Sequence, residues 1–365
     1  MELRVIGAED SDHEGRTERG TAAAAVNDGP STLSSSLSSG RPDTLPRWFG
    51  AGRTASLAIV GRFHAEPPPR TLFHYTSTAA LISIVRNNEL WLSDATSLND
   101  RVEIEHGLAI ARERLQAATA WDGHPEAQEM IRATLRTFDT EPSPAVYVAC
   151  FSFDGDDLAQ WRGYGQGDAP IAIEIEHGPL MFGYTSEGLL QQVRYELEEQ
   201  AWTFDEILRA YWYAYSEDLR DPKPSPRPDP IPLEEERSLC AGKLYHDLWR
   251  YIVACKDPAF RSEREVRFVY TAHDFSRGGR DWYPEHPEPM FRERAGRIIP
   301  FLSSKNLDFR NMPRVSDVLP LPIRSIRVGP TNDQMLIVRG VRRLLDAHGH
   351  EEVDVTTSSS PFRPR

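Results

Sequence analysis

The chain has 365 residues and a formal net charge of −13, which argues against wholesale wrapping of nucleic acid, although arginines such as Arg292, Arg294 and Arg297 can contact phosphates locally. Its three cysteines form an odd count without any Cys-x-x-Cys, which argues against both a disulfide framework and a structural zinc site. No apolar stretch approaches the roughly 18 residues that span a bilayer, and none follows a basic start, so we expect a cytoplasmic protein.

Residues 1–69 differ in composition from the rest of the chain. They are rich in Ala, Ser, Gly, Asp and Arg, and they end in Pro67-Pro68-Pro69. Such a composition buries too little apolar surface to offset the entropy of ordering, so we predict a flexible segment. Trp48-Phe49 and residues 57–60 are the exceptions and are candidates for a short element that docks on the domain. We expect residues 70–365 to form a single domain.

From Thr71 onward, apolar segments alternate with turn signals. The elements predicted here are a strand over residues 72–76, a helix with Leu81, Ile84 and Val85 on its apolar side that ends at Asn87-Asn88, a strand over residues 90–93, and a helix from Asn99-Asp100 with Ile104, Leu108, Ala111 and Leu115 on its apolar side. Residues 146–153 form a continuous apolar, β-branched and aromatic run, which is typical of a central strand buried on both faces. Glycines within residues 160–165 allow a sharp turn or a close backbone approach.

The second half of the chain mixes strands and helices. The predicted strands cover residues 171–176, 263–270, 297–302 and 323–328, with an edge strand at 353–356, and the predicted helices cover residues 204–219, 233–254 and 335–348. A Pro-rich surface insertion near residues 221–232 separates the first two of these helices. Because there is no regular βαβ alternation, we predict an α+β fold with a mixed or antiparallel central sheet flanked by helices.

The predicted strand at residues 263–270 carries an unusual charge pattern. Side chains alternate along a strand, so Glu263, Glu265 and Arg267 would share one face while the apolar residues between 266 and 270 point into the core. Like charges this close raise each other's pKa. The pair of glutamates is therefore either a solvated charge ladder or a site in which one acid is tuned for chemistry.

Several other residues each have a structural and a functional interpretation. His74 lies on the first strand, where a histidine is usually structural. Residues 100–103 have the form of a capping box, in which Asp100 accepts from first-turn amides and Glu103 reaches back. Trp161 and Tyr164 are one helical turn apart, so they suit either core packing or a stacking platform. Lys256 follows a helix, where its charge suits the dipole without any ligand.

Together these motifs follow one order along the chain. They are His74-Tyr75-Thr76, Leu90-Trp91-Leu92-Ser93, Asn99-Asp100-x-x-Glu103, Cys150-Phe151-Ser152, Trp161-x-x-Tyr164, Lys256 followed by Glu263-x-Glu265-x-Arg267, and Gly329-Pro330. In this order they resemble a large bacterial family that is catalogued as a domain of unknown function. The resemblance extends from about residue 71 to the C-terminus.

The order of parts also resembles, more remotely, that of ADP-ribosyltransferases. Those enzymes carry a His or Arg on an early strand, a Ser or Tyr in the middle, and a Glu on a late strand, often within Glu-x-Glu. This resemblance implies an ADP-ribosyltransferase-like fold, NAD as co-substrate, and an acceptor macromolecule whose identity is unknown. Cleaving the nicotinamide glycosidic bond builds positive charge on the ribose, which a fixed carboxylate stabilises.

The resemblance also implies roles for individual residues. Glu265 would hold a hydroxyl of the nicotinamide ribose and face the developing cation, Glu263 would orient an acceptor or assist its deprotonation, and His74 would bind a ribose hydroxyl. The other implied binding residues are Tyr164 or Tyr75, which would stack on nicotinamide, Lys256 or Arg267, which would neutralise pyrophosphate charge, and Ser152, which would support Glu265.

The chain also departs from the transferase pattern, and two other functions stay open. The His-Gly-Thr opening common among such transferases is His74-Tyr75-Thr76 here, and no Gly-x-Gly-x-x-Gly supports a Rossmann-type NAD site. One alternative is a metal-dependent hydrolase or nuclease with His74, Asp100, Glu103 and Glu265 around magnesium or manganese, although no His-Glu-x-x-His is present.

The other alternative is a non-enzymatic binding or regulatory module. Its acidic strand would be a structural charge ladder and its N-terminal segment a hook for a partner. If the protein is instead a transferase, a bacterial toxin or anti-phage effector is one setting, since modifying a host macromolecule lets few molecules have a large effect. This setting rests on analogy.

Overall fold

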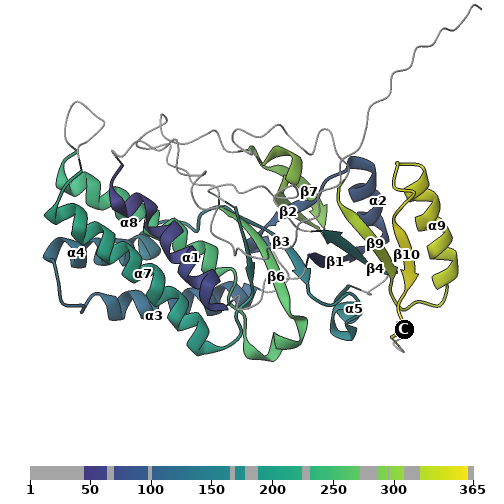
Figure 1. Ribbon diagram of the computed structural model, residues 1–365, viewed down its shortest axis with the longest axis horizontal. Helices are drawn as coiled ribbons and strands as arrows, with labels where there is room; N and C mark the ends of the chain where they lie inside the picture. Colours follow the sequence, from purple (N-terminus) through teal and green to yellow (C-terminus); the bar gives the residue numbers. More distant parts are fainter. Residues whose placement is uncertain are drawn as a thin grey trace, which may run out of the picture. The chain divides into compact units, whose positions relative to one another are not determined.

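The structure is a computed structural model that describes residues 45–63, 70–97, 101–164, 169–176, 188–223, 231–271, 287–294, 296–307 and 321–360. All of these residues belong to the compact unit Thr44–Arg365. Within the described residues, the central element is a ten-stranded sheet in the order β10-β9-β4-β1-β3-β2-β8-β7, from which β6 and β5 continue at β3 (Figure 1). Its strands are β1 (Thr71–Ser77), β2 (Trp91–Asp94), β3 (Val146–Ser152), β4 (Pro170–Glu176), β5 (Gly188–Gln192), β6 (Glu265–Thr271), β7 (Met290–Arg294), β8 (Arg297–Ser303), β9 (Ile323–Val328) and β10 (Asp354–Thr357).

Neighbouring strands are antiparallel except for β9 and β10, which run parallel. The predicted α+β class with a largely antiparallel central sheet is therefore confirmed. The predicted edge strand is also confirmed, because β10 ends the sheet.

The sheet divides at β3. β6 pairs with residues 146–152 of β3, so β1 and β2 share the other edge of β3. β1 pairs there at Ser152 only, and β2 pairs at Tyr147 and Val148. Both faces of β3 are buried: Val146 and Val148 belong to one apolar cluster, whereas Tyr147 and its same-face neighbours belong to another. This confirms the prediction of a central, doubly buried strand.

The helices form two groups, one beside β3 and β6 and one at the β9–β10 end of the sheet (Figure 1). They are α1 (Ala51–Phe63), α2 (Thr78–Asn87), α3 (Arg101–Ala118), α4 (Pro125–Thr140), α5 (Leu158–Tyr164), α7 (Leu197–Arg220), α8 (Leu233–Ile252) and α9 (Gln334–Asp346), with short 3-10 turns η1 (Arg47–Gly50), η2 (Ala95–Ser97), η3 (Pro258–Glu263) and η4 (Ser304–Asn306). In Figure 1, α1, α3, α4, α7 and α8 gather beside β3 and β6, while α2 and α9 lie at the β9–β10 end. No helix in the described ranges is long and apolar enough to cross a membrane. Of the predicted Pro-rich insertion, residues 224–230 lie outside the described ones.

The segment before the sheet differs from the sequence prediction. Residues 47–63 lie in the segment that we predicted to be flexible, but they form η1 and α1 and pack on α7. They include Trp48-Phe49 and residues 57–60, which we named as candidates for a docking element. Arg47 Nη1 donates to Asp218 Oδ1 at 3.0 Å, and the Trp48 amide donates to the same carboxylate at 3.1 Å. The side chains of this segment that enter the core are Trp48, Ala51, Ala55 and Ile59. Their spacing of three to four residues forms a helical apolar stripe that the averaged composition conceals.

Candidate functional site

The acidic segment is a turn followed by a strand. We predicted a strand that begins at Glu263, but Glu263 is the last residue of η3, and β6 begins at Glu265. Arg264 between them has φ 45° and ψ 46°, a left-handed conformation that residues other than glycine seldom adopt. Strand alternation therefore does not place the two glutamates together; the left-handed turn at Arg264 does. Ser152 Oγ fixes this turn by donating to the Glu263 carbonyl oxygen at 2.9 Å.

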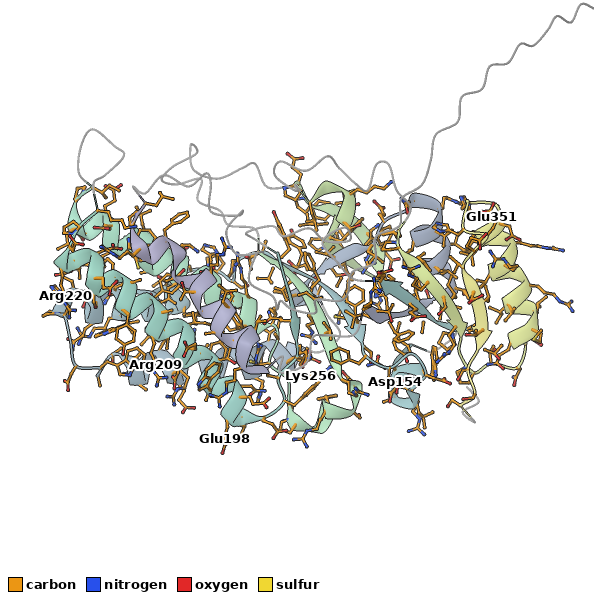
Figure 2. The ribbon with its side chains drawn as sticks, in the orientation of Figure 1. Asp154, Glu198, Arg209, Arg220, Lys256 and Glu351 are labelled. Carbon is orange, nitrogen blue, oxygen red and sulfur yellow. The ribbon has the colours of Figure 1, made fainter. Side chains whose placement is uncertain are left out.

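Five charged side chains converge at this turn, and we call them the carboxylate cluster: Glu103, Lys256, Glu263, Glu265 and Arg267. They come from α3, the segment after α8, η3 and β6. Lys256 Nζ lies 2.8 Å from Glu103 Oε1, 2.5 Å from Glu263 Oε2 and 3.4 Å from Glu265 Oε2. Figure 2 shows Lys256 at the boundary between the helices and the sheet. The cluster thus joins the helical layer to the sheet.

Arg267 holds Glu265 with a two-point contact. The two residues share one face of β6, and Arg267 Nε and Nη2 donate to Glu265 Oε1 and Oε2, each at 2.8 Å. The remaining donors reach Glu103 Oε2 at 2.8 Å and the Val253 carbonyl oxygen at 2.6 Å. Burial alone would raise the pKa of Glu265, but the charges of Arg267 and Lys256 outweigh it and lower that pKa to about 2. Glu265 is therefore ionised at neutral pH.

Glu263 has a different environment although it contacts the same lysine. Its side chain is 24% exposed, compared with 8% for Glu265. Burial raises the pKa of Glu263 above its ordinary value, and the contact with Lys256 only partly opposes this. The environments of the two carboxylates thus move their pKa values in opposite directions, which is a common property of acid–base pairs in active sites.

The net charge of the cluster limits the chemistry that it suits. Three carboxylates face two cations, which leaves one negative charge in excess. An arrangement of this kind favours a cationic group, or a positive charge that develops during a reaction, near its exposed side. Glu263 is at that side, so it is the member best placed to contact a ligand or to accept a proton.

The observed contacts of Ser152, Lys256 and Arg267 differ from the roles that we predicted for them from the sequence. We expected Ser152 to support Glu265 through its hydroxyl, but Ser152 Oγ positions the Glu263 backbone instead. We expected Lys256 or Arg267 to neutralise a pyrophosphate, but both are engaged with carboxylates of the cluster. Both cations are engaged because Glu103, about 160 residues away in sequence, adds a third carboxylate that contacts Lys256 and Arg267.

His74 does not join the carboxylate cluster. Phe73, Ser152 and Glu265 are directly opposite one another across three strands, so their side chains share a face, and His74 follows Phe73 on the other face. Accordingly, the His74 ring lies 5.7 Å from the ring of Phe151, which belongs to the cluster on that other face. Its Nδ1 atom is 2.9 Å from the Cys150 carbonyl oxygen, and burial lowers its pKa.

The aromatic residues of the predicted site are placed as follows. The Tyr75 ring packs edge-on against Trp161 with centroids 4.7 Å apart, and both residues are buried. The Tyr75 hydroxyl donates to the Asp154 carbonyl oxygen at 2.8 Å and accepts from the Asp157 amide at 2.9 Å. Of the two interpretations of Trp161, core packing is the one observed. The side chain of Tyr164 and residues Asn99 and Asp100 lie outside the described part of the structure.

Sequence reasoning missed two neighbours of the cluster. The Tyr195 hydroxyl accepts from the Glu265 amide at 3.0 Å and fixes the start of β6, and no local pattern in the sequence points to it. Cys150 lies opposite Arg267 on β3, where burial and then the charge of Glu265 raise the pKa of its thiol. The alternation of Cys150 with Ser152 on β3 could have identified it. A thiol in this state is a packing group rather than a nucleophile.

The geometry gives little support to a metal site. Among the described residues, no group of three or more His, Cys, Asp and Glu side chains is placed to hold a metal ion. Glu103 and Glu265 direct their oxygens at Lys256 and Arg267, and His74 lies on the other face of the sheet. A metal ion would therefore have to displace both Lys256 and Arg267 from these carboxylates before it could bind.

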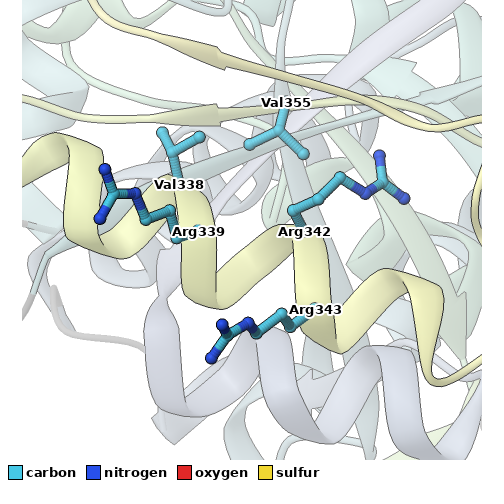
Figure 3. A pocket seen from close by; sticks show the side chains of 5 residues that line it. All are labelled: Val338, Arg339, Arg342, Arg343 and Val355. Carbon is cyan, nitrogen blue, oxygen red and sulfur yellow. The ribbon is translucent and has the colours of Figure 1, made fainter.

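A surface hollow lies elsewhere in the fold. It has a volume of about 370 Å³, and Val338, Arg339, Arg342 and Arg343 of α9 line it together with Val355 of β10 (Figure 3). Strands β9, β4 and β1 separate β10 from β3, so the hollow is not part of the carboxylate cluster. Arg342 is engaged there with Asp346 and the Val353 carbonyl oxygen.

Comparisons with known proteins locate one similarity. Residues 160–268 match a family described as "Protein of unknown function (DUF2971)". This segment contains Lys256, Glu263, Glu265 and Arg267, so a resemblance to a domain family of unknown function is supported for the part of the chain that carries most of the cluster. No curated protein matches the chain, and no solved structure does.

Proposed function

We propose that the protein is an ADP-ribosyltransferase-like enzyme that transfers ADP-ribose from NAD to an acceptor macromolecule. The observation that supports this proposal is the contrast between two neighbouring carboxylates. Arg267 keeps Glu265 ionised, with a pKa of about 2, whereas burial raises the pKa of the half-buried Glu263. One group then suits the stabilisation of positive charge, and the other suits proton transfer.

In this reaction the bond between ribose C1′ and the nicotinamide nitrogen breaks, and nicotinamide leaves with the electron pair. Positive charge develops on the ribose, and the excess negative charge of the carboxylate cluster would stabilise it. The acceptor's nucleophilic atom then bonds to C1′, and its proton passes to Glu263.

The contacts suggest a refinement of the roles expected from the sequence. Both oxygens of Glu265 already accept from Arg267, and one of them also contacts Lys256. Glu263 has the more exposed side chain, so we assign it the contact with the ligand and assign Glu265 the positioning of Lys256 and Arg267. His74, on the opposite face, has no part in this refined assignment.

The test is nicotinamide release from NAD by the purified protein, with cell lysate as the source of acceptor. Glu263→Gln keeps the size of the side chain and leaves the hydrogen bond from Ser152 to the backbone of residue 263 in place. We expect it to lower nicotinamide release by roughly a hundredfold or more. Glu129→Gln is the control, because Glu129 forms surface ion pairs on α4. Circular dichroism should show the same folded state for both variants. The absence of release from folded wild-type protein would contradict the proposal.

A non-enzymatic binding or regulatory module is the second candidate, and one observation favours it. Every charged member of the cluster is paired within the cluster, which is what a structural connection between α3, β6 and the segment after α8 requires. Under this alternative, Glu263→Gln leaves biological activity unchanged, and Glu265→Gln acts only through stability. A toxin or anti-phage setting for the transferase would instead show as slowed growth on expression of wild-type protein but not of Glu263→Gln.

A further inference from the structure

Strand β7 forms one end of the central sheet, and among the described residues it pairs with β8 alone. Phe291 on β7 lies directly opposite Pro300 on β8. Because proline has no N–H, this pair cannot exchange main-chain hydrogen bonds, so the N–H and C=O groups of Phe291 point away from β8. Hydrogen-bonded and non-hydrogen-bonded pairs alternate along an antiparallel ladder, so the main-chain groups of Glu293 also point outward. None of these outward groups has a main-chain partner within the described ranges.

One face of the β7–β8 hairpin carries three arginines, and we call it the arginine face. Arg292 and Arg294 share it because side chains alternate along a strand, and Arg297 joins them because it lies directly opposite Arg294. Arg292 is held in place there by Ser93, whose Oγ accepts from Nη2 at 2.7 Å. Like charges in directly opposite positions destabilise a hairpin, and among the described residues no carboxylate lies within 4.0 Å of these arginines. An acidic partner would remove this repulsion.

The other face of the hairpin is apolar and exposed, and we call it the apolar face. Phe291 and Ile298 lie on it, since each is the sequence neighbour of an arginine on the arginine face. Phe291 is 64% exposed and Ile298 is 77% exposed. An additional strand beside β7 would cover this surface with every second side chain and would direct the side chains between them toward the arginine face.

We propose that β7 binds an extended acidic peptide segment of another protein as an additional strand of the sheet. The segment would carry Asp or Glu at alternate positions opposite the arginine face and apolar residues between them opposite the apolar face. A peptide is favoured over a nucleic acid, because phosphates would engage the arginines but would leave the outward main-chain groups and the apolar face unused. None of the residues belongs to the carboxylate cluster, so the inference stands independently of the proposed transfer reaction.

Fluorescence anisotropy with the full-length protein at low ionic strength tests the proposal. The probe is a labelled short peptide in which valine and glutamate alternate, and we expect it to bind wild-type protein saturably. A peptide with lysine in place of glutamate should not bind. In antiparallel addition, the residue opposite Phe291 shares its face and exchanges main-chain bonds with it. Methylation of the valine amides should therefore weaken binding roughly tenfold or more.

Substitutions at Glu293 test the strand edge in the protein itself. Glu293→Pro removes an outward N–H and leaves the hydrogen bonds to β8 in place, as edge strands allow. We expect it to weaken peptide binding roughly tenfold or more. Glu293→Gln is the matched control: it keeps the main chain and an oxygen that can accept from the Gly296 amide, and it should change binding less than twofold.

One further variant keeps the test decisive if Glu293→Pro does not fold. Arg294→Gln removes an exposed charge from the arginine face and should weaken peptide binding severalfold, whereas Arg339→Gln on α9 should leave it unchanged. Absence of peptide binding by wild-type protein, or equal affinities of the Glu293→Pro and Glu293→Gln variants, would overturn the proposal. A single-stranded oligonucleotide that binds more tightly than the peptide and depends on Arg294 would overturn the assignment to a peptide partner.

Discussion

Glu263 and Glu265 share one ammonium group, with Lys256 Nζ lying 2.5 Å from Glu263 Oε2 and 3.4 Å from Glu265 Oε2. Because the same group also contacts Glu103 at 2.8 Å, a single cation separates three carboxylates. Burial opposes the charged form of Lys256, but the carboxylates outweigh it and raise its pKa. Lys256 is therefore the residue on which the electrostatic balance of the site depends most directly.

The first prediction is that Lys256→Met destabilises the protein by about 3–5 kcal/mol at pH 7. Glu103 and Glu265 would keep only Arg267 as a cation, and Glu263 would lose its contact with Lys256. Urea unfolding measures this loss. The destabilisation should decrease on acidification to about pH 4, because protonation of Glu263 removes part of the repulsion. Arg324→Met is the control: Arg324 is 61% exposed in its ion pair with Glu176, and its loss should cost no more than about 1 kcal/mol. Similar losses in both variants would contradict this account.

Acid should remove the stabilisation that Glu265 provides. Its pKa is about 2 in the folded protein compared with an ordinary value of 4.5, so its contribution is complete above pH 4.5 and is lost as the pH falls toward 2. This difference corresponds to about 3 kcal/mol, as an order of magnitude. Glu263 works in the opposite direction, because its raised pKa favours the folded state at low pH. The free energy of unfolding should therefore fall less steeply in Glu265→Gln than in wild type between pH 5 and pH 2.5, and parallel curves would refute the assignment.

The left-handed turn at Arg264 gives a third prediction. Glycine adopts φ 45° without strain, so Arg264→Gly should keep the position of Glu263 and change stability by less than about 1 kcal/mol. Valine is disfavoured there by its branched Cβ, and Arg264→Val should cost about 1–2 kcal/mol or more. Thermal unfolding measures the stability of each variant. Nicotinamide release, on the proposed function, reports whether Glu263 keeps the position that the reaction needs. Equal behaviour of the two variants would show that the turn does not control the site.

The parts of the fold that were predictable are those that local patterns determine. The continuous apolar run at β3 can be satisfied only by burial on both faces, and this is observed. The Asn87-Asn88 stop after α2 is confirmed by the left-handed conformation of Asn88. In contrast, α4 was missed, although Pro125 at its first position and the spacing of its buried residues are helix signals.

The sequence predicted some members of the carboxylate cluster but not its arrangement, since His74 and Tyr75 lie away from the cluster. The motif residues Glu103, Lys256 and Arg267 do come together, but no sequence pattern states that α3 and β6 meet. The sequence did not predict the contacts of Glu103 with Lys256 and Arg267 because residues 100–103 have the form of a capping box. A first-turn glutamate in a capping box needs no distant partner. The start of β6 was misplaced for a different reason: arginine is not a residue that signals a left-handed turn.

The docking of the first helices gives the last prediction. Trp48 is 6% exposed, its indole Nε1 donates to Glu236 at 3.3 Å, and its amide donates to Asp218. Trp48→Ala should therefore destabilise the protein by about 3–5 kcal/mol, through lost burial and a cavity against α7 and α8. Leu57→Ala is the matched control on α1, where a side chain that is 66% exposed should contribute less than about 0.5 kcal/mol. Urea unfolding distinguishes the two outcomes. A Trp48→Ala variant as stable as wild type would mean that residues 47–63 are not part of the cooperative unit, as the composition alone had suggested.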